Sequence, residues 1–410
     1  MAAQRAPQHR LLTSRIAVRI VVISNDVTLG FGVPVAAPGL RASGLAEGLA
    51  AHGHSVITLV PEDLLLQLFG TALPEPPAHT RIVAPSKFMA AIEDVGAEVV
   101  VFINSNLTPH LRPVSGVHFV YDLFAPKMLE RQASNGVDPA ALAQLEAVKH
   151  RAMALADSMW VNGARKVDYG LGWLARPDVD QIRTGEFALP SRRSLNLAKL
   201  VTVVEMPVPL PPGISPKSPN HQKAAADSVA RLGIAGYAQR WSSLQEVHHG
   251  HQLLVDSGHD LHSLLPGHWG GNPDTIPHTS LPVGVTLSEG PLLFDEFASW
   301  VQSMDAMVDV FNPSDERRFA MITRSAVALR LGVPLIHAVD SEISDIVVEH
   351  NAGWVLDPDD VEAWRVVARE IADPEQRVLK SAGAVDASIN RFAPASALAR
   401  AAAAIGTLAR

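Results

Sequence analysis

The sequence predicts an α/β protein made of two doubly wound domains. Three observations support this fold class. The chain has 410 residues, which is more than one ordinary hydrophobic core accommodates. Its composition is 47% hydrophobic and 19% charged, so it can bury two cores. Two successive series of alternating strands and helices follow one another, and a proline-rich segment separates them.

The first series begins at IAVRIVVISND (residues 16–26), an apolar, β-branched run that predicts a buried strand. A glycine- and proline-rich loop at 28–39 leads into a helix expected at 41–52, and HGHSVITLV (52–60) is the next strand. This order is a βαβ unit, and nearly continuous apolar strands are typical of a sheet covered on both faces. Further strands are expected at AEVVVFINS, GVHFVYDLF and DSMWVNG, with a helix at 138–155 before the last of them.

The segment MPVPLPPGISPKSPNH (206–221) holds six prolines and marks the domain boundary, because proline interrupts both helices and central strands. We therefore expect an N-terminal domain at 1–205, a linker at 206–223 and a C-terminal domain at 224–390. The second series contains strands at SVARLGIAGYA, HDLHSLLPGHW, PVGVTLSEG, MDAMVDVFN, VPLIHAV and AGWVLDP, with helices at 242–257 and 292–302. An alanine-rich helix at 391–410 ends the chain, and we expect it to cross back to the first domain.

Composition excludes several classes of protein. A net charge of −8 argues against nucleic-acid binding, which requires a basic face. The absence of cysteine rules out disulfides, thiolate metal sites and cysteine nucleophiles. No apolar run reaches the roughly 18 residues that a membrane span needs, and the apolar stretch at 16–24 continues into Asn25–Asp26 rather than a cleavage site. We expect a cytoplasmic protein.

Several segments resemble the retaining glycosyltransferases of family 4, in particular those of polysaccharide gene clusters with a MAGPG[IL]R signature. They are VAAPGLRASGLAEGLAAHGHSVITLVP (35–61), VYDLFAPKMLE (120–130), ADSMWVNGARKVDYGLGWL (156–174) and VDVFNPSDERRFAMITRSAVALRLGVPLIHAVDSEISDIVVEHNAGWVLDPDD (308–360). The last of these segments matches the features of that branch in their order along the chain. These features are a glutamate at Glu316, an F-R-T-R-like turn at Thr323–Arg324 and a G-x-P strand that begins at Gly332. The likeness is thin over 210–290.

This resemblance implies the GT-B fold, in which two Rossmann-like domains face each other across a cleft. It also implies transfer of a hexose or deoxyhexose from a nucleotide-sugar donor to a glycan or lipid-linked acceptor, with retention of configuration. The leaving phosphate would help to accept the acceptor's proton on the same face. No metal and no cofactor beyond the donor substrate is implied. Peripheral membrane contact stays open, although no amphipathic basic helix demands it.

A departing nucleoside diphosphate needs groups that stabilise negative charge, and glycine loops, helix N-termini and arginines supply them. The candidate donor-binding residues come from three segments: the first loop with the following helix, the turn after the first strand of the second domain, and the start of the helix before LRLG. They are Gly30, Gly32, Gly39, Arg41, Gly236, Arg240, Ser242, Thr323 and Arg324. Each competes with a purely structural interpretation as a turn glycine, an exposed arginine or a helix cap.

Two carboxylates are candidate catalytic residues. Asp122 follows an apolar strand, and open α/β sheets place ligands at the carboxyl ends of their strands. It could orient or deprotonate an acceptor hydroxyl, or it could be a salt-bridged or capping residue. Glu316 matches the first glutamate of the family stretch, and it also has the position of a helix N-terminal charge.

The sequence departs from the family pattern at three positions. The second carboxylate of the usual Glu-x7-Glu pair would fall at Val327 or at Arg324, and Ile322 replaces the first arginine of the F-R-T-R turn. The lysine that normally accompanies the phosphate arginine corresponds to Ser242 or Ser243. These departures keep a second hypothesis open, a non-catalytic relative that acts as a partner or regulator of a glycosyltransferase.

Two other interpretations are weaker. A nicotinamide-dependent enzyme would need G-x-G-x-x-G in a first loop and an acidic residue after the second strand, and the sequence has neither. His248 and His251 share a helix face in HHGH, but no third metal ligand follows at a useful spacing. We interpret them as part of a solvated helix face.

Overall fold

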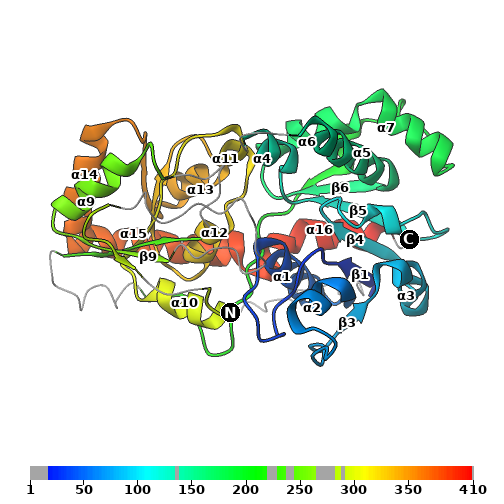
Figure 1. Ribbon diagram of the computed structural model, residues 1–410, viewed down its shortest axis with the longest axis horizontal. Coiled ribbons are helices and arrows are strands. Elements are labelled where there is room, and N and C mark those ends of the chain that lie inside the picture. Colours follow the sequence, from blue (N-terminus) through cyan, green and yellow to red (C-terminus); the bar gives the residue numbers. More distant parts are fainter. Residues whose placement is uncertain are drawn as a thin grey trace, which may run out of the picture.

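Two α/β lobes lie side by side in the molecule, and Figure 1 shows their sheets with helices packed around them. The computed structural model describes residues 17–133, 138–218, 229–236, 244–264, 282–287 and 291–408. Blue to green elements form the N-terminal lobe, and green to orange elements form the C-terminal lobe (Figure 1).

The N-terminal lobe contains a parallel sheet with the order β3-β2-β1-β4-β5-β6-β7 over its described residues. Its central strands are buried on both faces; in β1 four of five residues are inaccessible to solvent, as expected for a sheet covered by helices. The strands are β1 (Arg19–Ile23), β2 (Ser55–Pro61), β3 (Thr80–Val83), β4 (Val99–Ile103), β5 (His118–Leu123), β6 (Ser158–Val161) and β7 (Val201–Val203).

The helices of this lobe connect and cover those strands. They are α1 (Ala37–Ala51), α2 (Glu62–Phe69), α3 (Phe88–Val95), α4 (Lys127–Ala133), α5 (Pro139–Leu155), α6 (Lys166–Leu174) and α7 (Pro177–Gln181). Helix α1 begins at Ala37, before the predicted start at 41, with Pro38 in its first turn, where a missing N–H group costs nothing. Helix α5 begins where Asp138 accepts a hydrogen bond from the N–H of Ala140.

The C-terminal lobe contains a second parallel sheet, whose described strands follow the order β10-β9-β8-β11-β12-β13. The strands are β8 (Arg231–Ala235), β9 (Asp260–Leu264), β10 (Thr286–Leu287), β11 (Ala306–Asp309), β12 (Leu335–Ala338) and β13 (Gly353–Leu356). The helices are α9 (His248–Asp256), α10 (Phe294–Gln302), α11 (Asp315–Phe319), α12 (Thr323–Arg330), α13 (Glu342–His350), α14 (Val361–Ala372) and α15 (Pro374–Ala387). In both lobes the strand order reverses next to the first strand, the switch point of a doubly wound sheet.

The last helix, α16 (Pro394–Leu408), packs against α1 of the N-terminal lobe, and Figure 1 shows it in red beside that lobe. Gly48 makes this close contact possible. A Cβ atom there would lie 2.2 Å from Leu398 Cδ1 and 2.4 Å from the Pro394 carbonyl oxygen. The chain thus passes between the lobes twice within the described residues, once at 204–218 and once before α16.

The first part of the crossing between the lobes is buried. Val204, just before the proline-rich segment, and Met206 and Val208 within it are inaccessible to solvent and belong to a hydrophobic core that extends through both lobes. The N–H of Val208 donates to the carbonyl of Phe392, which precedes α16. The prolines prevent regular secondary structure in this segment. The buried side chains of Val204, Met206 and Val208 pack into the core and hold the crossing in place.

A polar contact joins the lobes at another place. Glu342, the first residue of α13, accepts hydrogen bonds from the N–H groups of Ala164 (2.9 Å) and Arg165 (3.0 Å), just before α6. The Arg165 guanidinium pairs with Asp345 at 2.8 Å and also with Asp340. A carboxylate from one lobe therefore satisfies N–H groups at a helix start in the other.

Arg41 and Asp122 form a fully buried ion pair, which corrects their predicted roles. Arg41 Nε donates to Asp122 Oδ2 at 3.0 Å and Nη2 to Oδ1 at 2.8 Å, and both side chains have no solvent exposure. Nη1 donates to the carbonyls of Val204 and Glu205. With all of these atoms engaged inside the protein, Arg41 has a structural role in place of donor binding, and Asp122 one in place of catalysis.

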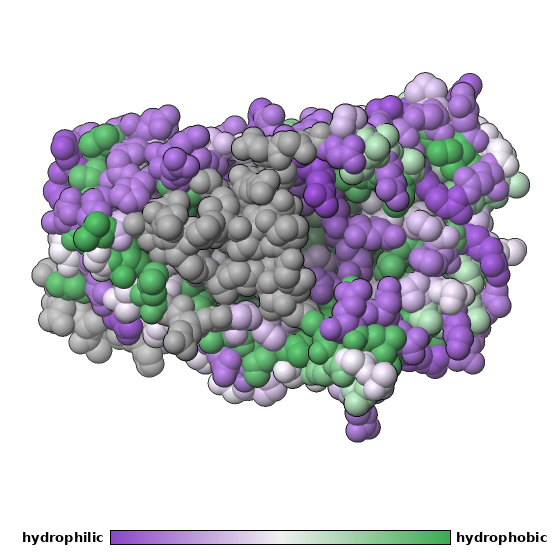
Figure 2. Space-filling model, in the orientation of Figure 1, coloured by the Kyte–Doolittle hydropathy of each residue, from purple (hydrophilic) through white to green (hydrophobic). Residues whose placement is uncertain are grey.

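Within the described part of the chain, no helix combines the length and apolarity needed to cross a membrane. The face shown in Figure 2 mixes hydrophilic and hydrophobic side chains, and the hydrophobic ones gather along the lower edge of the view, near α2.

Replacing Asp122 by Ala should destabilise the protein by about 3–5 kcal/mol, because it leaves the Arg41 guanidinium buried without its counter-charge. Denaturant unfolding measures the loss. The matched control is Asp94→Ala, which breaks the exposed pair with Arg81 and should cost less than about 1 kcal/mol. Equal losses for the two variants would contradict the structural role of the buried pair.

Candidate functional site

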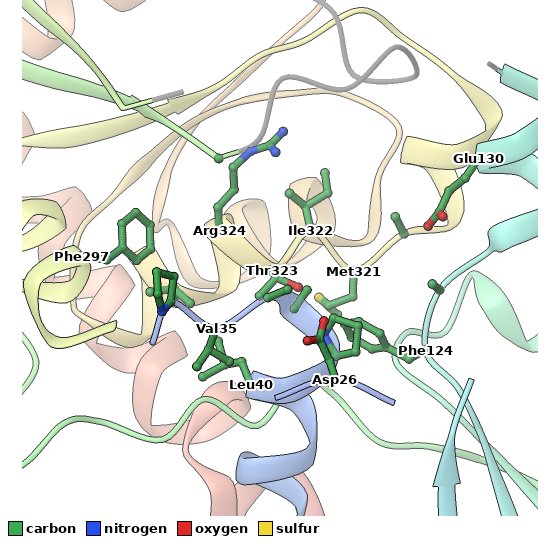
Figure 3. Close-up of a pocket in the computed structure, with 18 of the residues that line it drawn as sticks. Asp26, Val35, Leu40, Phe124, Glu130, Phe297, Met321, Ile322, Thr323 and Arg324 are labelled. Carbon is green, nitrogen blue, oxygen red and sulfur yellow. The ribbon is translucent and has the colours of Figure 1, made fainter. Parts of the chain in front are cut away.

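A cleft of about 450 Å³ lies between the lobes, at the carboxyl ends of strands from both sheets. Segments after β1, β4 and β5 form its N-terminal wall. Segments after β8 and β11, the last residue of β9 and the start of α10 form the opposite wall. Ligands of doubly wound domains bind at such strand ends. Figure 3 shows Asp26, Val35, Leu40 and Phe124 from one lobe facing Phe297 and residues 321–324 from the other.

A buried carboxylate organises the C-terminal wall. Asp309 ends β11 and accepts hydrogen bonds from the guanidinium groups of Arg317 (3.0 Å) and Arg324 (2.9 and 3.0 Å). Ser325 Oγ donates to its other oxygen. Burial raises the pKa of Asp309, but the two arginines outweigh it and hold the pKa well below its usual range. This carboxylate stays ionised and fixes both guanidinium groups.

Three of the predicted donor-binding residues lie together in one wall of the cleft. They are Gly236, Thr323 and Arg324. Thr323 is the first residue of α12, so the positive end of that helix faces the cleft. Gly236 follows β8 with φ +108°, and a Cβ atom there would lie 2.9 Å from Arg324 Nη1. Glycine is needed for the turn and for this contact. The Arg324 guanidinium also lies 4.1 Å from the centre of the Phe311 ring.

Glu316, a predicted catalytic residue, lines the same cleft. It lies in the first turn of α11, where Ser314 caps the helix by accepting from the N–H of Arg317. Burial and the nearby Glu130 raise the pKa of Glu316 to about 7. Near neutral pH the group can therefore donate a proton in a hydrogen bond as well as accept one.

The N-terminal wall combines apolar and polar side chains. Val35, Leu40 and Phe124 supply the apolar surface, while Asp26 and Asn104 supply polar groups at the ends of β1 and β4. In Figure 3 the Asp26 carboxylate lies beside Phe124. Burial raises the pKa of Asp26 to about 6, although the N–H of Val27 and the charge of Lys127 oppose that shift.

Other predicted donor-binding residues do not line the cleft. Gly30 and Gly32 form the turn after β1, with φ of +98° and +70°. Gly39 lies within α1, where a Cβ atom would meet the Val27 carbonyl oxygen at 1.8 Å, so it is a packing residue. This corrects the predicted loop role. Arg240 and Ser242 lie outside the described residues.

The predicted histidine face is only partly solvated. His251 is completely buried and lies edge-on to Trp364, with 5.6 Å between ring centres. Burial lowers its pKa to about 3. Its neutral ring is thus a packing group between α9 and α14, because helix-face periodicity alone does not tell which face meets a neighbour. No group of three potential metal ligands occurs among the residues that the structure covers.

Sequence reasoning missed Asp309, Asp26 and Asn104. The sequence contained a signal for each of them, because all three follow apolar strand segments, as Asp122 does. The strand-end position could not distinguish a side chain that turns into the core, as Asp122 does, from one that lines the cleft, as Asp26 does. That choice depends on the neighbouring strands and helices.

No family model and no curated protein matches this chain, but solved structures do. A sucrose-phosphate synthase from Thermosynechococcus elongatus matches with a TM-score of 0.65, at 13% identity over 95% of this chain and 98% of that one. The catalytic domain of starch synthase IV from Arabidopsis thaliana, bound to ADP and acarbose, gives 0.60 at 10% identity, covering 96% and 99%. HepE of Anabaena, in complex with UDP and glucose, gives 0.57 at 11% identity, covering 95% and 100%.

These likenesses extend over both lobes of each protein and therefore show the architecture. The chain has the GT-B fold, with two Rossmann-like domains that face each other across a cleft. This confirms the fold class expected from the sequence. At such low identity the shared fold does not by itself fix the reaction.

The stability of the protein should fall as the pH rises from about 4.5 to above 7, through the contribution of Glu316. Its pKa is about 7 in the folded protein against an ordinary 4.5, so between these values the folded state retains a proton that the unfolded state has lost. The effect amounts to about 3 kcal/mol. In Glu316→Gln this component should vanish, which urea unfolding between pH 5 and 8.5 measures.

Glu93→Gln, on the exposed surface of α3, is the matched control and should keep the wild-type pH dependence. If Glu316→Gln retains the wild-type slope as well, the raised pKa of Glu316 is wrong.

Proposed function

We propose that this protein is a glycosyltransferase that moves a hexose or deoxyhexose from a nucleotide-sugar donor to a glycan or lipid-linked acceptor, with retention of configuration. Its membership of the MAGPG[IL]R-type branch of family 4 is part of this proposal. The donor would lie against the C-terminal wall of the cleft and the acceptor against the N-terminal wall.

The arrangement around Asp309 carries the proposal. Two guanidinium groups bond to one carboxylate, so these three side chains together keep a positive charge at the cleft. Arg324 reaches the lining, and its side chain is 17% exposed. The start of α12 adds the positive end of a helix dipole. A diphosphate is the anion that such a pair of fixed guanidiniums and a helix N-terminus would hold.

Glu316 would serve the sugar side of the donor. A protonated carboxyl donates to a hydroxyl or phosphate oxygen, whereas an ionised one would repel the diphosphate. Its pKa of about 7 permits the protonated form, and a bound diphosphate would raise the pKa further, because nearby negative charge favours the neutral acid. The family resemblance predicts contact of this glutamate with the substrates.

Three of the similar structures support a nucleotide donor. HepE is described in complexes with UDP and with UDP-glucose, and the starch synthase holds ADP. The second carboxylate of the family pattern remains the main difference, because Arg324 occupies one of its two candidate positions and binds Asp309. A donor held by this chain would therefore need another partner for its ribose.

The proposed reaction follows from these assignments. The acceptor hydroxyl oxygen forms a bond to the anomeric carbon while the bond from that carbon to the phosphate oxygen breaks. The nucleoside diphosphate leaves with the bonding electrons, and its oxygen takes the acceptor's proton on the same face of the sugar. The guanidinium groups stabilise the charge that grows on the leaving oxygen. No base from the protein is required in this route.

The competing hypothesis is a GT-B-fold relative without catalytic activity that acts as a partner or regulator. The absence of a carboxylate at both Val327 and Arg324 favours it. It expects an intact fold and no specific binding of nucleotides.

A panel of UDP-, GDP-, dTDP- and ADP-sugars, with the free nucleotides, should reveal a donor by thermal shift. A donor at one hundred times its dissociation constant adds about 2.7 kcal/mol of stability. Arg324→Ala should remove this stabilisation, and Arg324→Lys should weaken it because lysine loses the two-pronged contact. Arg318→Ala is the matched control, since this arginine lies on α11, is exposed and pairs with Asp340 outside the cleft lining.

No shift with any member of the panel would overturn the transferase proposal in favour of the non-catalytic relative. A wild-type shift in Arg324→Ala would show instead that Arg324 does not hold the phosphate and would return attention to Arg240, which lies outside the described residues.

A further inference from the structure

Asn104 is strained and only partly satisfied. It adopts a left-handed backbone conformation with φ of 56°, which asparagine tolerates better than most residues. The side chain is buried and lines the cleft, and its Nδ2 finds no hydrogen-bond partner among the described residues. A buried donor without a partner costs free energy, and unusual backbone at a cleft often accompanies a binding role.

The orientation of this amide is fixed by the backbone. The N–H of Ala125 donates to Asn104 Oδ1 at 2.9 Å, so the oxygen must point toward Ala125 and Nδ2 is left as the donor. The N–H of Asn104 itself donates to the Asp122 carbonyl at 3.0 Å. Asp122 is held by its ion pair with Arg41, and its backbone carbonyl in turn positions Asn104.

Asp26 supplies the complementary group beside it. Strands β1 and β4 are neighbours, and Ile23 lies opposite Phe102, so the chain segments carrying Asp26 and Asn104 leave the sheet next to each other. Both side chains line the same cleft. The N–H of Val27 donates to Asp26 Oδ1 at 2.7 Å and orients the carboxylate, which Figure 3 shows beside the Phe124 ring.

We propose that Asp26 and Asn104 bind hydroxyl groups of a sugar residue in the acceptor, so that the N-terminal wall recognises a carbohydrate rather than an apolar aglycone. This inference rests on the proposed transferase function and names the acceptor class of the same cleft. A carboxylate accepts from a hydroxyl and an amide Nδ2 donates to one, so the pair can hold hydroxyls in both of their hydrogen-bonding roles.

Nearby groups fit this assignment. Phe124 offers an apolar ring edge or face to the C–H groups of a sugar ring, and Lys127 contributes a further donor in the lining. Buried, oriented polar groups discriminate strongly for a hydroxylated ligand, because an apolar ligand would leave them without partners. Asp26 and Asn104 thus act in acceptor recognition and take no proton in the proposed reaction.

Saturation-transfer NMR with methyl α-glucoside, α-mannoside and α-galactoside tests the site in the full chain, with and without the nucleotide selected by the donor panel. At least one glycoside should bind the wild-type protein. Asp26→Asn and Asn104→Gly should each weaken that binding at least fivefold and leave nucleotide affinity within twofold of wild type. Glycine keeps the positive φ at 104 while it removes the amide.

Two controls separate recognition from folding. Asn351 also has a left-handed conformation, with φ of 53°, at the exposed end of α13, so Asn351→Gly makes the same backbone change away from the cleft. Asp63→Asn removes an exposed carboxylate on α2. Both should bind the glycoside as the wild type does, and melting curves confirm that the four variants fold.

The outcomes distinguish the two proposals. Nucleotide binding without glycoside binding, or with glycoside binding that the Asp26 and Asn104 variants leave unchanged, overturns the sugar-recognition inference alone. Glycoside binding that depends on both residues, without binding of any nucleotide, overturns the transferase proposal and leaves a sugar-binding site. Failure of both ligands to bind overturns both.

Discussion

The buried pair between Arg41 and Asp122 is the constraint on which the N-terminal half of the site depends. One guanidinium joins helix α1 to strand β5 through the carboxylate, and joins both to the crossing segment through the carbonyls of Val204 and Glu205. Removing two charges from water is costly, and here each of the three guanidinium nitrogens of Arg41 has a hydrogen-bond partner that offsets this cost. The same aspartate contributes its carbonyl to the N–H of Asn104. The position of the cleft's N-terminal wall therefore depends on a buried ion pair that does not line the cleft.

The C-terminal lobe uses a similar carboxylate for a different purpose. Asp309 also ends a strand and is also buried, but it is shared by Arg317 and Arg324. In the first lobe the charges balance and are sealed from solvent, whereas in the second the arginines outnumber the carboxylate and Arg324 reaches the cleft. Gly236, in the turn after β8, is packed against Arg324 and so contacts the cluster of Asp309, Arg317 and Arg324. In the proposed donor site, hydrogen bonds to Asp309 thus hold both guanidinium groups in place, as charge stabilisation requires.

The two halves meet through packing as much as through the cleft. Helix α16 packs against α1, Val204, Met206 and Val208 of the crossing are buried, and Glu342 accepts hydrogen bonds at the start of α6 from the opposite lobe. Motions between the lobes must therefore be accommodated at particular contacts, among which the Arg165 ion pairs with Asp340 and Asp345 are partly exposed. Exposed pairs are weaker and more sensitive to salt than buried ones. The Arg41–Asp122 and Arg317–Asp309 pairs, each within one lobe, are buried.

The sequence by itself determined the fold class and the main alternation of strands and helices, because apolar strand runs, helix periodicity and prolines are local signals. It also placed Gly236, Glu316, Thr323 and Arg324 among the candidates, and these four do line one cleft. Only the tertiary structure decided which strand-end carboxylate is buried and which is presented to a ligand. Asp122 and Asp26 have similar sequence contexts, yet the first is paired with Arg41 inside the core, whereas the second lies at the cleft with Lys127 nearby. Partners that are distant in sequence, such as Arg41 for Asp122, set that outcome, and a local pattern contains no information about them.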